Sequence, residues 1–179
     1  YGKPGKVFLG VVHRLDRPTS GVVVFARTSK ALSRLNAMFQ KRETQKTYWA
    51  VVEGKPSKAN GHLTHFMVRN QKQNKSYANN KEVPNSKKAE LSYSVLKALD
   101  RYTGLEVALY TGRHHQIRCQ LSVSGHPIKG DLKYGAKRSN KDASIHLHAR
   151  YISFKHPVSQ EEINITAPTP SDAIWDACN

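Results

Sequence analysis

Short segments with alternating apolar and polar residues recur along this chain of 179 residues, and they constrain its fold more than any other feature. A period of two is the pattern of a β-strand that buries one face. Short apolar β-branched runs bounded by turn residues are typical of buried strands as well. We therefore expect strands at 7–12, 22–27, 46–53, 61–68, 89–99, 105–110, 145–154 and 161–165.

Helical patterns are fewer than strand patterns. Thr28 or Ser29 can cap a helix that runs to about Arg42, with apolar residues recurring on one face. A second helix is expected at 115–124 and a short third one at 171–178. Many strands and few helices, joined mostly as hairpins, predict an α+β fold with a mixed, largely antiparallel sheet. We expect 1–179 to form a single domain, since the chain has the length of one.

One polar tract interrupts this pattern between residues 69 and 86. It is rich in Asn, Gln, Ser and Lys, with little to bury, so we expect a long, mobile hairpin tip. The tract is either a solvated loop or a basic flap that contacts phosphates. The preceding strand, at 61–68, is expected to pair with the strand at 46–53.

The charge of the chain indicates its partner. The chain has 29 Lys and Arg residues but 13 Asp and Glu residues, a net charge of +16. Such an excess suggests a polyanionic partner. No run approaches the roughly 18 apolar residues of a membrane span. Nucleic acid is therefore favoured over a membrane surface.

The two cysteines, Cys119 and Cys178, are far apart and match no metal or redox spacing. They are expected to be ordinary thiols in a reducing compartment. With no signal peptide in the sequence, we expect a cytoplasmic protein. We also expect it to be a monomer. The chain begins with Tyr1 rather than Met, and we expect it to be a fragment.

The stretch His13–Gly21 places one acid, Asp16, on a turn between two apolar runs. A polar loop held between rigid elements is a common location for a catalytic group. Asp16 is equally explained as a turn former or as the ion-pair partner of Arg14 or Arg17.

Three motifs, in order, resemble those of the RluA-type pseudouridine synthases. They are His13–Gly21, which resembles the active-site motif; Lys46-Thr47-Tyr48, which resembles the motif with the active-site tyrosine; and Thr111–Arg118, which resembles the third motif. The likeness extends over 7–168. The resemblance implies a curved sheet with flanking helices and a central catalytic cleft.

The resemblance also implies a reaction, the isomerisation of specific uridines in ribosomal or transfer RNA. Asp16 would be the nucleophile, attacking C1′ or acting on the sugar in a glycal route. A buried carboxylate needs a cation to offset desolvation, and we expect Arg113 to supply it. Tyr48 would stack on the base, with a part in removing the C5 proton left open. Leu15 and Ile117 would form apolar walls, although core packing explains both equally well.

Other residues of the first motif are expected to contact RNA. A uridine in a stem must be flipped out before it reacts, and Arg14 could fill the gap that it leaves. Arg17 and Thr19 are further candidates for substrate contact. Thr19 and Ser20 are expected to orient the loop through hydroxyl-to-backbone bonds. Candidates for phosphate contacts are Lys72, Lys75, Lys81, Lys87, Lys88, Lys129, Lys133, Lys137, Arg138 and Lys141.

No cofactor or metal is expected, because this reaction involves no redox change and the sequence has no phosphate-binding glycine loop. Several histidines could suggest a metal, among them His146 and His148 on one strand face. No Cys or carboxylate completes a familiar metal-binding spacing with them.

Two rival functions remain open. One is a non-catalytic RNA-binding or ribosome-assembly module on the same fold, which would have no chemical need for Asp16. The other, a hydrolase with paired carboxylates, is weak because no second acid accompanies Asp16 in the motifs. In the resembled family a Lys-Pro strand precedes the first motif, and many members carry a separate N-terminal RNA-binding domain. Lys3-Pro4 lies too close to serve as that pair, so we expect a truncated N-terminus without such a domain.

Overall fold

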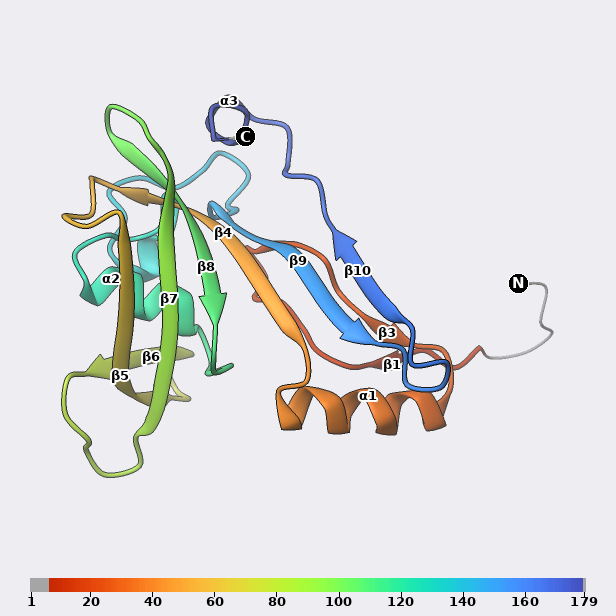
Figure 1. Ribbon diagram of the computed structural model, residues 1–179. Coiled ribbons are helices and arrows are strands. Elements are labelled where there is room, and N and C mark those ends of the chain that lie inside the picture. Colours follow the sequence, from red (N-terminus) through yellow and green to blue (C-terminus); the bar gives the residue numbers. More distant parts are fainter. Residues whose placement is uncertain (1–6, 179) are drawn as a thin grey trace.

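The computed structural model of the protein describes residues 7–178, and the loop expected at 1–6 lies outside them. These residues form three α-helices and ten strands (Figure 1). The strands are β1 (Gly10–Val11), β2 (Ser20–Gly21), β3 (Phe25–Ala26), β4 (Gln45–Glu53), β5 (Asn60–Asn70), β6 (Lys75–Asn79), β7 (Lys87–Ala98), β8 (Tyr102–Leu109), β9 (Leu147–Lys155) and β10 (Glu162–Thr166). The helices are α1 (Ser29–Lys41), α2 (Gln116–Val123) and α3 (Ala173–Asp176), with a 3₁₀ turn, η1 (Leu132–Tyr134).

The main sheet has the order β10-β9-β4-β8-β7-β5-β6. Neighbours in this order are antiparallel, and β2 adds a short parallel pairing to β9. The sheet is thus mixed and mostly antiparallel, so the predicted α+β fold class is confirmed. Helix α2 lies against the part of the sheet that contains β5, β7 and β8, whereas α1 lies at the other end, near β1 and β3 (Figure 1). No helix in the described range has the length and apolar character needed to cross a membrane.

The expected pairing of 61–68 with 46–53 is wrong. Strand β4 lies between β9 and β8, and β5 pairs with β7 and β6 instead. Alternation identifies which face of a strand is buried but not which strand is its neighbour. The hairpin expected between 89–99 and 105–110 is present as β7 and β8.

The polar tract at 69–86 is more ordered than expected, because part of it is strand β6. This strand pairs with the end of β5, for example Val68 with Tyr77. The composition of this tract suggests little to bury, but small side chains of β6 are buried or packed against the core. Ser76 is 2% exposed, and Ala78 packs against the cluster that contains Met67.

The apolar runs around the first motif form shorter and less buried strands than expected. β1 and β3 form a separate two-stranded ribbon of two residues each. One face of this ribbon packs on α1, where Ala26 and Leu35 are buried. The other face is open, since Val11 and its partner Phe25 are 60% and 47% exposed. Helix α1 itself begins as predicted, with the Thr28 hydroxyl accepting a hydrogen bond from the Ala31 amide at 3.1 Å.

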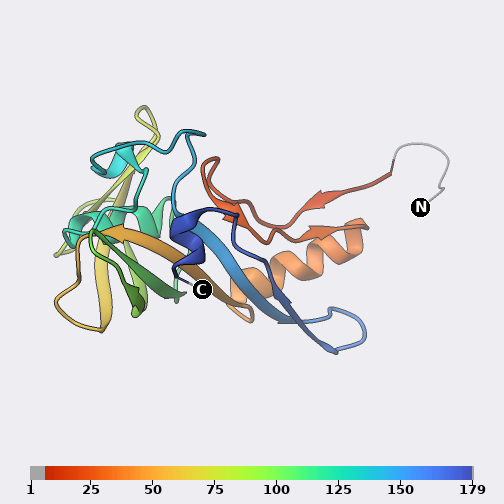
Figure 2. The same ribbon diagram turned by 90° about the horizontal axis from the view of Figure 1, so that it is seen from above.

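The core of the main sheet brings distant parts of the chain to one place. Val52, Leu91 and Leu105 from three strands are fully buried, and they pack with Ile117 and Leu121 of α2. Seen from above, the loop with the first motif reaches over the same side of the sheet as α2 (Figure 2). This side is therefore where the first and third motifs can meet.

Gly21 should be essential for seating the first motif on β9. Its φ is +119°, and an added Cβ would lie 2.4 Å from the Ala149 carbonyl oxygen. We expect Gly21→Ala to lower the free energy of unfolding by about 2–4 kcal/mol, from backbone strain and steric overlap together. Urea denaturation measures the change.

Gly112→Ala is the matched control, because a Cβ at Gly112 meets no atom within 4 Å. It should change the free energy of unfolding by about 1 kcal/mol or less. Equal losses in the two variants would contradict the steric account.

Candidate active site

The loop that carries Asp16 is closed by hydrogen bonds at its base and at its turn. The Val24 amide donates to Nε2 of His13 at 3.1 Å. The Thr19 amide donates to the Asp16 carbonyl at 2.9 Å, which closes the turn. Burial, with Lys46 nearby, lowers the pKa of His13 to about 4, so its ring is neutral and free to accept. The loop is therefore a fixed support for the Asp16 side chain.

The same loop is attached to the strand β9 and the residues just before it. The Ile145 amide donates to the Pro18 carbonyl at 3.0 Å, and the Val22 amide donates to the Ala149 carbonyl at 3.0 Å. Ser20 bonds through its hydroxyl to Nδ1 of His148 at 2.8 Å, which corrects the expected backbone partner. The position of Asp16 thus depends on residues more than 120 positions away.

Asp16 forms an ion pair with Arg118, which lies in α2. Nη1 of Arg118 is 3.2 Å from Oδ2 of Asp16. The same guanidinium holds Asp131 through two bonds, Nε to Oδ2 at 2.6 Å and Nη2 to Oδ1 at 2.8 Å. Burial opposes the charge of Arg118, but Asp131 and Asp16 together raise its pKa above the ordinary value. Asp131 holds Nε and Nη2 of the guanidinium, and Asp16 accepts a hydrogen bond from the remaining nitrogen, Nη1.

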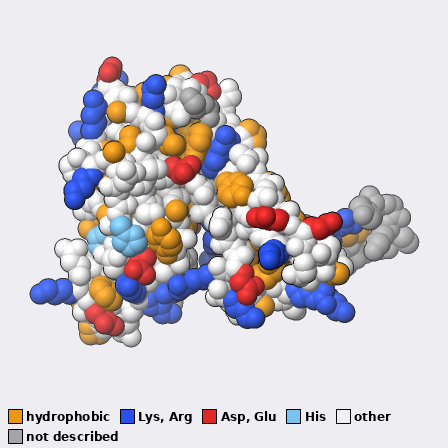
Figure 3. Space-filling view, in the orientation of Figure 1, with side chains coloured by type: hydrophobic (Ala, Val, Ile, Leu, Met, Phe, Trp, Pro, Cys, Tyr) orange, Lys and Arg blue, Asp and Glu red, His pale blue; other side chains and the backbone are white. Residues whose placement is uncertain are grey.

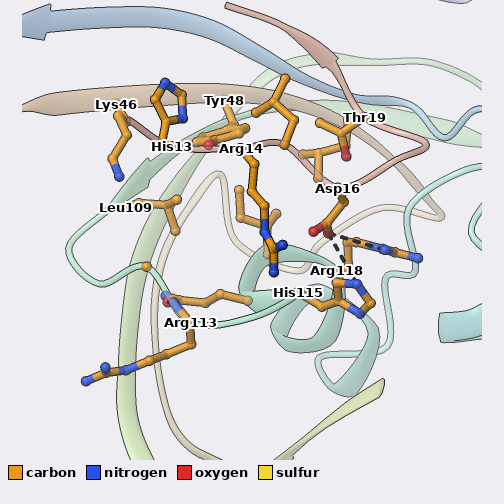
Figure 4. A pocket seen from close by; sticks show the side chains of 15 residues that line it. His13, Arg14, Asp16, Thr19, Lys46, Tyr48, Leu109, Arg113, His115 and Arg118 are labelled. Carbon is orange, nitrogen blue, oxygen red and sulfur yellow. Dashed lines mark hydrogen bonds and ion pairs between the residues drawn. The ribbon is translucent and has the colours of Figure 1, made fainter. Parts of the chain in front are cut away.

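The expected pairing of Asp16 with Arg113 is wrong. Arg113 donates from Nε to the Lys88 carbonyl at 3.0 Å, and its side chain extends away from Asp16 (Figure 4). The residue precedes α2, so its side chain leaves the chain in another direction from that of Arg118. Arg113 still lines the cavity beside Asp16.

His115 is a second neighbour of Asp16. Its Nε2 lies 3.7 Å from Oδ2 of Asp16, and the two side chains face each other (Figure 4). His115 has a φ of 52° and a ψ of 30°. This left-handed backbone conformation raises the free energy of a non-glycine residue by about 1–3 kcal/mol. Such strain persists only where surrounding contacts hold the residue. His115 is 8% exposed, and its ring stacks on that of His114 with 3.8 Å between the ring centres.

A small cavity of about 210 Å³ opens in front of Asp16. Tyr48, Leu109 and Ile117 line it, as do Arg14, Leu15 and Thr19 from the loop. Seven of the residues singled out in the sequence are thus brought together, and Arg17 lines an adjoining cavity instead.

Tyr48 enters the cavity from β4, where the register against β9 shifts between Thr47 and Tyr48. Such a bulge changes the direction in which a side chain points. Burial, with a smaller effect of Asp16, raises the pKa of the Tyr48 phenol to about 12. The hydroxyl is therefore neutral near pH 7, and the ring offers an apolar face to a planar ligand.

Two polar groups at the cavity, the Thr19 hydroxyl and the Lys46 ammonium, are placed to contact a ligand. The buried Thr19 hydroxyl makes no hydrogen bond within the described part of the chain, although its position beside Asp16 is set by the turn. Lys46 also lines the cavity, and burial lowers the pKa of its ammonium group. Both groups are available to a polar ligand.

A larger, more open cavity of about 810 Å³ adjoins the first and shares Asp16 with it. Its lining is strongly basic and comprises Arg14, Arg17, Arg69, Arg113, Arg118 and Lys133 among others. Lys and Arg side chains also gather along the lower edge of the molecule, over α1 and the lower ends of β5 and β7 (Figure 3). The basic lining of this cavity would attract an anionic chain to Asp16.

The histidines bind neighbouring protein groups. His146 faces the Asp172 carboxylate at 2.9 Å, and Nε2 of His148 lies 3.2 Å from the Ala167 carbonyl oxygen. Within residues 7–178, no three His, Cys, Asp or Glu side chains come together as metal ligands.

Four residues of the site are not predicted from the sequence: Arg118, His115, Asp131 and Tyr134. Arg118 and His115 lie within the third motif, but the motif does not distinguish between its two arginines. Asp131 and Tyr134 lie outside all three motifs, so no motif indicates them. A buried carboxylate beside a basic motif can be recognised only once the fold is known.

The sequence matches the family model described as RNA pseudouridylate synthase over residues 2–123. It is 40% identical over 169 residues to an uncharacterized RNA pseudouridine synthase of Chloroflexus aurantiacus, covering 94% of this chain and 52% of that protein. It is 34% identical to ribosomal large subunit pseudouridine synthase C of Vibrio vulnificus, covering 93% of this chain and 53% of that protein. The chain therefore spans about half the length of these curated relatives.

The fold is also similar to a solved structure, that of human RNA pseudouridylate synthase domain containing 1. The TM-score is 0.79 and the sequence identity is 26%. The similarity covers 96% of this chain and 73% of the human chain. It extends beyond the residues matched by the family model.

The structure predicts very different roles for the two arginines of the third motif. Arg118→Met would leave the Asp131 carboxylate, 1% exposed, without its counter-charge. Removing one member of a buried ion pair costs about 3–5 kcal/mol. We expect this loss in the free energy of unfolding, measured by urea denaturation.

Arg113→Met provides the matched control, because Arg113 is half-buried and binds only a backbone carbonyl. Its effect should be below about 1 kcal/mol. A larger loss in Arg113→Met than in Arg118→Met would refute this assignment.

Proposed function

Because the chain belongs to the RNA pseudouridylate synthase family, we propose that it converts uridine in RNA to pseudouridine and that Asp16 acts on the ribose. One observation carries the proposal: the Asp16 carboxylate faces a small cavity while Arg118 holds it at 3.2 Å from behind. This position suits a carboxylate that must reach a sugar carbon while it is only partly exposed to water.

The reaction requires three changes at the nucleotide. The N1–C1′ bond breaks, the uracil turns within the cavity, and C5 bonds to C1′. The C5 proton is then lost and N1 gains a proton, so that the product is an isomer of the substrate. Asp16 either attacks C1′ or acts on the sugar to give a glycal, and both routes need a charged carboxylate with a fixed direction. The ion pair with Arg118 stabilises that charge.

The remaining cavity residues suit a detached uracil. The Tyr48 ring can stack on the base, and Leu109 and Ile117 provide apolar walls. A uracil held in this way stays close to C1′ while it turns. The unpartnered Thr19 hydroxyl can bind the ribose or the base.

RNA binding is supported by the basic cavity next to Asp16. A nucleotide must leave its stack to reach the small cavity, at a cost of a few kcal/mol. Arg14 is exposed and lines both cavities, so it can occupy the space that the nucleotide leaves. Arg17, Arg69 and Lys133 lie where phosphates on either side of the nucleotide would pass. Phosphate contacts of this kind position RNA without reading its sequence.

Large-subunit ribosomal RNA is the target that we propose, because the Vibrio vulnificus relative is named for that RNA. Transfer RNA is the alternative, and mapping of pseudouridine in RNA from cells lacking the gene distinguishes them. A cytoplasmic monomer is part of the same proposal. Size-exclusion chromatography of the chain tests the oligomeric state.

Asp16→Asn should bind RNA and form no pseudouridine. The amide has nearly the same shape as the carboxylate but cannot supply the negative charge. We expect RNA affinity within about threefold of wild type and a loss of rate of at least about 10³-fold, the scale on which enzymes depend on such groups. Filter binding and tritium release from [5-³H]uridine RNA provide the two measurements.

A matched control is Asp142→Asn, since Asp142 is exposed and bonds only to Ser144. It should retain full activity. If the wild-type chain binds RNA but never isomerises a uridine, the chain is instead a binding module on this fold.

RNA affinity should depend on salt through the basic cavity. Arg69 is exposed at the end of β5 and lines that cavity. Each phosphate contact contributes about 0.7 to the slope of log K against log salt for single strands. We therefore expect Arg69→Gln to reduce the slope by about 0.7, measured by fluorescence anisotropy of labelled RNA.

Lys58→Gln removes the same charge from an exposed residue at the opposite end of β5. Its slope should equal that of the wild type. The same decrease in both variants would mean that the cavity has no special part in binding.

A further inference from the structure

A line of buried polar groups leads from the backbone of β6 to Asp16. The Ser76 amide donates to the Tyr134 hydroxyl oxygen at 2.8 Å. That oxygen lies 3.0 Å from Nδ1 of His115, whose Nε2 lies 3.7 Å from Oδ2 of Asp16. Tyr134 is 4% exposed and His115 is 8% exposed, so both groups depend on these contacts rather than on water.

The hydrogen-bond directions along this line follow from the first donor. A backbone amide can only donate, so the Tyr134 oxygen accepts from Ser76 and must place its own proton elsewhere. Within residues 7–178, Nδ1 of His115 is the recorded acceptor in reach of that proton. A buried hydroxyl proton without an acceptor would cost about 1–3 kcal/mol. Tyr134 therefore donates to Nδ1 of His115.

The imidazole proton must then lie on Nε2, the nitrogen that faces Asp16. The opposite tautomer would fail at both ends of the ring. Its Nδ1–H would leave the Tyr134 proton without an acceptor, and its Nε2 lone pair would face a carboxylate oxygen. Because both ends favour the same tautomer, the line of contacts presents an N–H group to Asp16.

Both groups are neutral near pH 7. Burial lowers the pKa of His115 to about 4, although Asp16 acts in the opposite direction. Burial also raises the pKa of Tyr134 to about 12. Tyr134 contacts the other partner of Asp16 as well, since the Arg118 guanidinium lies 5.1 Å from the centre of its ring.

We propose that Tyr134 and His115 are positioning residues, with Tyr134 fixing the His115 tautomer in which Nε2–H is directed at the Asp16 carboxylate. This inference rests on the proposed function. Arg118 and His115 together determine which way the carboxylate points. At 3.7 Å the Nε2–H group acts on the carboxylate through its dipole and not through a hydrogen bond, and the neutral ring adds no second positive charge beside Asp16. The arrangement resembles the outer hydrogen bond that orients a metal-bound histidine.

The tautomer can be measured directly in the free protein. Long-range ¹H–¹⁵N correlation spectra of histidine-labelled chain distinguish a protonated ring nitrogen from an unprotonated one. The signals of His115 are those that disappear in His115→Gln. We expect Nε2 protonated and Nδ1 unprotonated at pH 7.

Tyr134→Phe removes the donor to Nδ1 while keeping the ring. We expect a mixture of both His115 tautomers in this variant and a fall in kcat of about 10-fold, with KM within twofold. Loss of an outer hydrogen bond of this kind costs about 10- to 100-fold at metal sites, and a second partner of Asp16 remains here. Tyr151→Phe is the control, because it loses a hydroxyl bond to Asn164 of β10, and neither residue lines the cavity, so it should match wild type.

Two results overturn the inference: Nδ1 protonated in the wild-type chain, or a kcat for Tyr134→Phe within twofold of wild type. The first does not depend on Tyr134→Phe, so it stands even if that variant does not fold. A chain that forms no pseudouridine contradicts the proposed function instead, whatever the tautomer.

Discussion

The structure depends on one guanidinium that serves two carboxylates. Asp131 takes two of its nitrogens in a buried pair, which leaves Nη1 directed at Asp16. A lysine could not do this, because a single ammonium has no planar fork to bind one carboxylate with two parallel bonds and still reach another. The charge on Asp16 is thus opposed by a cation whose own position is fixed from behind.

Three distant segments must be assembled for this contact to exist. The loop with Asp16 is attached to β9, Arg118 lies in α2, and Asp131 follows α2 just before η1. The sheet provides the common support, since β9 and the packing surface of α2 belong to the same layer. Mobility in any one segment would misdirect the carboxylate, which explains why so many hydrogen bonds join the loop to β9.

Around this rigid centre the surface is basic and open. The small cavity has apolar walls at Leu109 and Ile117, whereas five arginines and a lysine help to line the adjoining cavity. This division matches two tasks in the proposed function. Positive charge would attract and align the phosphates without sequence preference, and the carboxylate of Asp16 would act on the one nucleotide that enters.

The sequence by itself determined most of the strands, helices α1 and α2, and most of the residues that line the small cavity, because periodicity, capping and motif order are local properties. Strand pairing is not determined in this way. The sequence predicts the segment 61–68 as a neighbour of β4, and it predicts residues 75–79 as part of a hairpin tip, whereas β4 pairs with β8 and β9 and residues 75–79 form β6. Only the tertiary structure distinguished Arg118 from Arg113 as the partner of Asp16 and brought Asp131, His115 and Tyr134 close to that pair. A partner for a buried charge is chosen by distance and direction between segments that lie far apart in the chain, and neither quantity is written in local sequence.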